Sequence, residues 1–192
     1  MANRIVSMSK EKVKINLPPE YHWLLDEPGP NVLTEALKLY GVKEVPGDGD
    51  NPVIIGWADE VRDRLGISYS KDSTPWCGLF MAVVARRSGF EPPYLCIRAK
   101  EWAKFGSYSK VPKFLDVLVF DRKGGGHVGL YVGEDETHFH VLGGNQRDSV
   151  SIVRIDKTRE LIARRWPWKT KQPSNIRIVK LTSSGIISND EQ

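Results

Sequence analysis

The chain has 192 residues, of which 40% are hydrophobic and 27% are charged, a composition typical of one globular domain with a substantial core. Its two cysteines exclude a disulfide framework and a C-x-x-C metal site. The formal net charge of +4 favours encounter with anionic polymers without choosing among them.

Targeting signals are not apparent in the sequence. No apolar run approaches the roughly 20 residues of a membrane span, and the N-terminus lacks the apolar core of a signal peptide. We therefore expect synthesis in the cytoplasm and no integral membrane segment. Work outside the cytoplasm would need another export route.

The N-terminal half shows helical periodicity after a polar arm, residues 1–30. Apolar residues recur at spacings of three and four, and glycines follow the periodic segments as stop signals. Thr74 is the expected N-cap of the third helix, with Pro75 in its first turn. The predicted helices cover residues 32–40, 53–65, 75–89 and 97–106.

From residue 116 the pattern changes to short β-branched or alternating segments separated by turns. These segments predict antiparallel strands at residues 116–120, 127–133, 138–144, 149–155 and 161–166. Helices followed by strands indicate an α+β domain, with N-terminal helices packed on a small antiparallel β-sheet. We expect this domain to cover residues 31–168 and a C-terminal extension to cover residues 169–192.

Cys77, in the segment TPWCGLF, lies at the predicted start of a helix. Unpaired backbone N–H groups there make a positive pole that favours a thiolate and can hold an oxyanion. Cysteine is also common in protein cores, so this position alone leaves both a nucleophile and a structural residue open. Cys96 lacks such a context, and a Cys77–Cys96 disulfide is not expected.

A nucleophilic cysteine needs a base, and the base needs an orienting group. His127 opens a predicted strand after three glycines, and Asn145 follows the next strand in the segment VLGGNQ. Because the two strands form one hairpin, Asn145 is expected beside His127. The sequence order Cys77, His127, Asn145 then gives the layout of a papain-like site, in which the third residue fixes the imidazole tautomer.

Three segments carry a resemblance to a known group: DSTPWCGLFMAVVARRSG, LDVLVFDRKGGGHVGLYVGED and VLGGNQRDSVSI. They resemble the CHAP and NlpC-like cysteine peptidases, which are papain-like peptidoglycan hydrolases, and most of all a phage-associated group. The resemblance implies Cys77 as nucleophile, His127 as base and Asn145 as orienting residue. It departs from the family at Leu115, where glycine is usual before the aspartate, so Asp116 is given only a structural role.

Aromatic residues and possible metal ligands also occur near these segments. Trp76, next to the sulfur, and Trp102 are candidates for substrate binding, with core packing the competing interpretation for Trp102. His138 and His140 have a spacing that could ligate zinc, and the turn GDGDN has oxygen ligands that could hold calcium. Neither site has a complete ligand set, so we expect no metal and no cofactor.

The sequence therefore predicts a monomeric cysteine hydrolase that cleaves an amide bond of bacterial peptidoglycan in the periplasm or outside the cell. An endopeptidase and an N-acetylmuramoyl-L-alanine amidase fit equally well. The resemblance implies a phage lysin with holin-assisted release or a virion-associated hydrolase, with peptidoglycan rather than nucleic acid as partner. The alternative is a non-catalytic module of the same fold that binds the cell wall or a virion protein.

Overall fold

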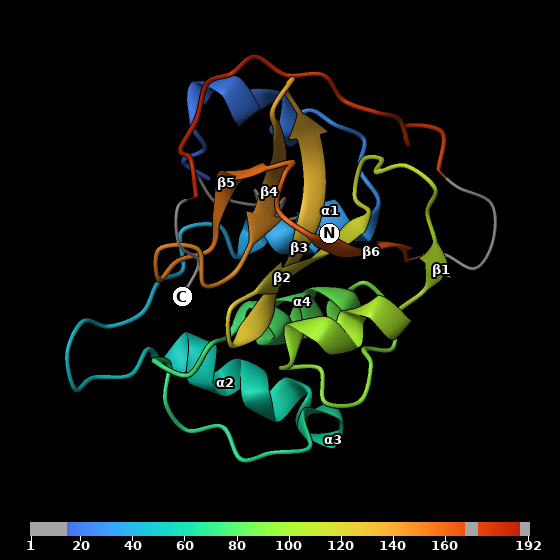
Figure 1. The fold of residues 1–192 in the computed structure, drawn as a ribbon. Helices are drawn as coiled ribbons and strands as arrows, with labels where there is room; N and C mark the ends of the chain where they lie inside the picture. Colours follow the sequence, from blue (N-terminus) through green and yellow to red (C-terminus); the bar gives the residue numbers. More distant parts are fainter. Residues whose placement is uncertain (1–14, 168–172, 189–192) are drawn as a thin grey trace, which may run out of the picture.

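The computed structural model describes residues 15–167 and 173–188, and it has the α+β class expected from the sequence. The helical elements are η1 (Pro19–Leu25), α1 (Asn31–Lys38), α2 (Pro52–Glu60), α3 (Arg62–Leu65), α4 (Cys77–Arg87) and η2 (Ala99–Lys104). The strands are β1 (Ser107–Tyr108), β2 (Val117–Arg122), β3 (Gly125–Glu134), β4 (His138–Gly143), β5 (Ser151–Asp156) and β6 (Leu161–Trp166). Figure 1 shows the sheet in one half of the molecule and helices α2, α3 and α4 in the other.

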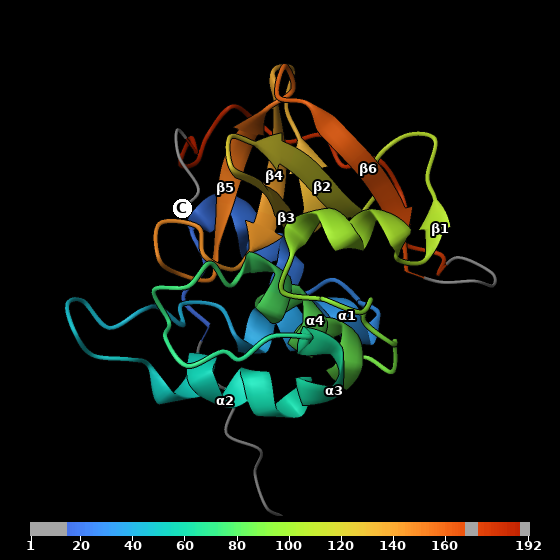
Figure 2. The same cartoon turned by 60° about the horizontal axis from the view of Figure 1, so that its bottom comes forward.

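The strands form one antiparallel sheet in the order β1-β6-β2-β3-β4-β5. Side chains alternate between two faces, as strand geometry requires. On β2, Val117 and Val119 join the core shared with the helices, whereas Leu118 and Phe120 join a second apolar cluster. That second cluster also takes residues from β5 and β6, at opposite ends of the strand order, because the sheet curls toward itself (Figure 2).

Helix α4 lies at the centre of the molecule. Every residue from Cys77 to Ala85 is buried, since the segment CGLFMAVVA carries no polar face. The helix contacts α1, α2 and η2 as well as strands β3 and β4. Its N-terminus is thereby fixed against the sheet strand that begins with the glycines before His127.

Two predicted helices differ from expectation. The segment 53–65 is split into α2 and α3 at Val61, whose backbone angles are φ −123° and ψ 23°, and it ends at Gly66 in the left-handed conformation. The segment 97–106 forms the 3₁₀ helix η2 instead of an α-helix. The remaining predicted helices and the five predicted strands are present with shifted ends.

Residues 15–30, expected as part of an arm, pack on the domain. Leu17, Tyr21 and Leu24 are buried in the main core, and Tyr21 Oη lies 2.7 Å from His140 Nδ1 on β4. Residues 173–188 also lie against the sheet, with single bridges from β3 to Lys180 and from β5 to Ile187. Residues 1–14 of the predicted arm, residue 168 of the predicted domain, and residues 169–172 and 189–192 of the predicted C-terminal extension lie outside the described residues. Within the part described, no helix combines the length and the apolar composition needed to cross a bilayer.

The turn before β2 shows how Leu115 is accommodated at the position where the sequence resemblance led us to expect glycine. Leu115 has φ 65°, a left-handed conformation for which glycine is favoured, and its side chain is fully buried. Asp116 is buried too, and its Oδ2 accepts a hydrogen bond from the Lys113 backbone N–H at 3.0 Å. Burial raises the pKa of Asp116 to about 6. Leu115 therefore keeps the glycine geometry through apolar packing, and Asp116 closes the turn.

Candidate active site

Cys77 is the first residue of α4. The helix was predicted to start at a Thr74 cap, but its N-cap residue is Trp76 and no side chain of that residue closes the cap. The Phe80 N–H makes the first helical bond, to the Trp76 carbonyl at 2.9 Å. The N–H groups of Cys77, Gly78 and Leu79 thus lack a helical acceptor one turn back and form the positive end of the helix.

The Cys77 thiol lies in a site that stabilises its charged form. Burial by itself raises the pKa of the Cys77 thiol, but the hydrogen bond and charge of His127, with the backbone N–H groups of Val128 and Gly78, outweigh burial and lower this pKa below its usual value. Both cysteines are free thiols, and burial raises the pKa of Cys96 to about 11. The two thiols therefore differ sharply, and only Cys77 has the environment of a nucleophile.

The side chain that bonds the His127 ring is that of Gln146, with Nε2 of His127 3.0 Å from Oε1 of Gln146. Gln146 Nε2 donates to the carbonyls of Val141 at 3.2 Å and Ser151 at 2.7 Å. These two acceptors fix the amide orientation, so Oε1 must face the ring and His127 Nε2 must carry the proton. Nδ1 of His127 is then the ring nitrogen left for the Cys77 sulfur.

Asn145, predicted to orient His127, makes different contacts in the structure. Its Oδ1 accepts a hydrogen bond from the Trp76 backbone N–H at 3.1 Å, and its Nδ2 donates to Glu44 Oε1 at 2.9 Å. The hairpin brings the segment to His127 as expected, but the orienting amide belongs to Gln146, one residue later. Asn145, with φ 56°, instead ties the residue before Cys77 to the β4–β5 loop.

Trp76 and Trp102 do not line the site as predicted. Both side chains are 0% exposed and belong to the main core. The Trp76 indole N–H donates to Glu44 Oε1 at 2.7 Å, and the Trp102 indole N–H donates to the Cys96 carbonyl at 2.8 Å. Their indole groups therefore support the polypeptide around Cys77 from within and are not exposed to a substrate.

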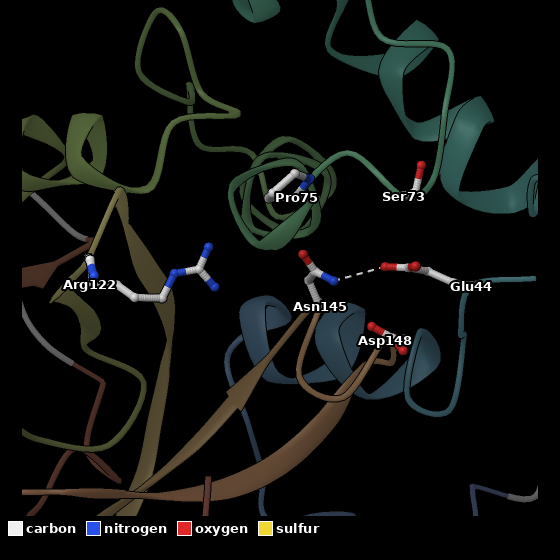
Figure 3. Close-up of a pocket in the computed structure, with 7 residues that line it drawn as sticks. Glu44, Ser73, Pro75, Arg122, Asn145 and Asp148 are labelled. Atoms are coloured by element: carbon white, nitrogen blue, oxygen red, sulfur yellow. Dashed lines mark hydrogen bonds between the residues drawn. The ribbon is translucent and has the colours of Figure 1, made fainter. Parts of the chain in front are cut away.

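Two adjoining cavities of about 490 Å³ each form a cleft along the site. One opens onto Cys77 between the loop before η2 and the β2–β3 turn. The other is bordered by Glu44, Ser73, Lys123, Asn145 and Asp148. Both share Pro75 and Arg122, and Figure 3 shows the Arg122 guanidinium directed toward Asn145 and Pro75. Sequence reasoning gave no role to Gln146, Glu44 or Arg122.

The two histidines considered as zinc ligands, His138 and His140, interact with side chains of the protein. The two ring nitrogens of His140 bond Tyr21 Oη and Asp135 Oδ2, the latter at 3.0 Å. His138 Nδ1 lies 2.8 Å from the Thr137 hydroxyl. Across residues 15–167 and 173–188, no group of three or more His, Cys, Asp or Glu side chains is placed to hold a metal ion.

Similarity to known proteins is found in comparison with solved structures. No family model matches the chain, and no curated protein matches it. The chain is similar to a Staphylococcus aureus protein described as similar to a lipoprotein of the NLP/P60 family, with a TM-score of 0.41 and 17% identity. The match covers 80% of this chain and 44% of that protein. The family, the substrate and the phage association expected from the motifs stay predictions.

Proposed function

We propose that the protein is a cysteine-dependent hydrolase that cleaves an amide bond in bacterial peptidoglycan. The observation that carries this proposal is the placement of Cys77 at a helix N-terminus against His127, whose ring is oriented by Gln146. A thiolate, a positioned imidazole and a fixed tautomer are the groups that acyl transfer needs. The cleft beside Cys77 supplies access for an extended substrate.

The arrangement supports a two-step reaction. The Cys77 thiolate attacks the carbonyl carbon, and the oxyanion is held by backbone N–H groups at the start of α4. As the C–N bond breaks, the protonated His127 gives its Nδ1 proton to the departing amine, which leaves a thioester. Water then attacks the thioester while His127 accepts its proton, and the carboxylic acid leaves as Cys77 returns to the thiolate.

Gln146 and Asn145 have separate positioning tasks in this scheme. Gln146 holds the His127 ring with Nδ1 toward the sulfur in both steps. Asn145 holds the Trp76 backbone N–H and so fixes the residue that precedes the nucleophile. Neither residue touches the reacting atoms.

The substrate class rests on the three sequence segments that resemble peptidoglycan hydrolases. An endopeptidase acting on the stem peptide and an N-acetylmuramoyl-L-alanine amidase both fit the same groups. A phage lysin or a virion-associated hydrolase is the setting that we propose for it. The competing function, a binding module of the same fold, would have no use for a Cys77 pKa lowered by His127.

Digestion of purified sacculi tests this function. We expect the wild type to release soluble fragments, Cys77→Ala to release none, and Cys96→Ala, as the matched thiol control, to remain active if folded. Mass spectrometry of the fragments identifies the bond from its new termini. Equal fragment release by the wild type and Cys77→Ala would rule out the thiol mechanism, and binding to sacculi without release would favour the binding module.

A further inference from the structure

Two arginine side chains from different segments of the chain border the cavity at Cys77. Arg98 precedes η2, and Arg122 ends β2. Within the described ranges, neither guanidinium has a hydrogen bond or an ion pair with another side chain. A guanidinium that borders a cavity and has no anionic partner in the protein can bind an anion that enters the cavity.

The other charged groups of this cavity are neutralised by their neighbours. Lys100 Nζ lies 2.5 Å from Asp121 Oδ1, and Glu101 Oε2 lies 2.5 Å from Lys104 Nζ. The charge that this cavity presents to a ligand therefore comes mainly from Arg98 and Arg122. Part of the Arg122 side chain is shielded from solvent, which strengthens its interaction with an anion.

The neighbouring cavity carries acidic side chains at the end away from Arg122. Glu44 and Asp148 border it, and Figure 3 shows both on the side of Asn145 away from Arg122. Burial and the nearby Asp148 raise the pKa of Glu44. Since like charges repel, a substrate carboxylate is disfavoured at that end and favoured beside Arg122.

We propose that Arg98 and Arg122 bind a carboxylate that the substrate carries close to its scissile amide, so that the enzyme selects acidic peptides over their carboxamide analogues. This inference rests on the proposed hydrolase function and adds the substrate class that its cleft accepts. Arg122 contributes a planar fork able to bind both carboxylate oxygens, and Arg98 contributes a second cation at the border of the same cavity.

The direct test compares two alkylating reagents of similar size, iodoacetate and iodoacetamide, which both transfer a carbon to the Cys77 sulfur with loss of iodide. Their rate ratio at Cys77, assigned by mass spectrometry, reports whether the cavity favours a carboxylate. We expect this ratio to fall roughly tenfold in Arg122→Gln and by a smaller factor in Arg98→Gln. Lys110→Gln, which removes an exposed cation outside both cavities, should leave the ratio unchanged.

A second readout uses paired peptide substrates that differ only by a carboxylate or a carboxamide next to the scissile bond. The wild type should cleave the acid with the higher kcat/KM, and Arg122→Lys should retain more of this preference than Arg122→Gln. Ratios that stay within twofold of wild type in both arginine variants, or that fall equally in Lys110→Gln, would overturn the proposal. A Cys77 that reacts as an ordinary thiol, with a ratio that still falls in the arginine variants, would instead refute the hydrolase function and leave the carboxylate site standing.

Discussion

Replacing Gln146 by alanine should distinguish the role of the Gln146 side chain from that of the adjacent Asn145. The change removes the acceptor of the His127 Nε2–H and the donor to the Val141 and Ser151 carbonyls. A hydrogen bond to a charged group contributes about 1.5–3 kcal/mol, so kcat/KM should fall roughly 10- to 150-fold. Because the imidazolium loses a partner, the pKa of the Cys77 thiol should rise, and alkylation should require a higher pH.

Asn145→Ala is the matched control for this prediction. It removes two hydrogen bonds, one buried and one partly buried, against three for Gln146→Ala. Because alanine is also disfavoured at φ 56°, the loss of stability should be similar, about 2–3 kcal/mol. Its effect on the pH profile of alkylation should nevertheless be small, because Asn145 acts on the Trp76 backbone and not on the ring. Urea unfolding gives the stabilities, and stopped-flow alkylation between pH 4 and 10 gives the profiles. A profile shifted by Asn145→Ala and unmoved by Gln146→Ala would refute this division of roles.

Two further predictions concern the scaffold. A Cβ added at Gly78 would lie 2.4 Å from the carbonyl oxygens of Cys96 and Ile97, so Gly78→Ala should destabilise the protein by about 1–3 kcal/mol. Gly56 lies in a helix with open space around it, so Gly56→Ala should stabilise the protein by about 0.5–1 kcal/mol. Chemical denaturation measures both changes. Burial raises the pKa of Asp116 to about 6, so the free energy of unfolding should fall by up to about 3 kcal/mol as pH rises from about 4 through 6. Asp116→Asn lacks this ionisation, so its melting temperature should rise relative to that of the wild type over the same pH range. A melting-temperature difference that stays constant with pH would contradict this prediction.

The sequence predicted those elements of the fold whose local hydrophobic pattern matches the way they pack in the structure. The alternation in β2 to β5 predicted the sheet, and the apolar segment after Cys77 predicted the buried helix α4. The prediction that a hairpin of β3 and β4 places the segment after β4 near His127 is confirmed. These features depend on neighbours in sequence or on one short connection.

Features that depend on distant contacts were not predictable in this way. The start of α4 depends on the bond from the Trp76 N–H to Asn145, 69 residues away, which no local cap signal indicates. A register shift in the β3–β4 pairing, between Tyr131 and Gly133, changes which side chains share a face, so alternation could not decide between Asn145 and Gln146. Trp76 lies beside the nucleophile in sequence, yet its indole is buried, and the indole N–H donates to Glu44 at the border of the neighbouring cavity.

The central claim is that His127 holds Cys77 as a thiolate. The pH dependence of Cys77 alkylation by iodoacetamide, measured in wild type and in His127→Gln, tests it most directly, with the modified residue assigned by mass spectrometry. The account predicts that the alkylation midpoint of wild-type Cys77 lies below the ordinary thiol pKa of about 8.5. In His127→Gln the midpoint should move above that value, because burial remains without the imidazole. Identical profiles in the two proteins, or a wild-type midpoint near 8.5, would contradict it.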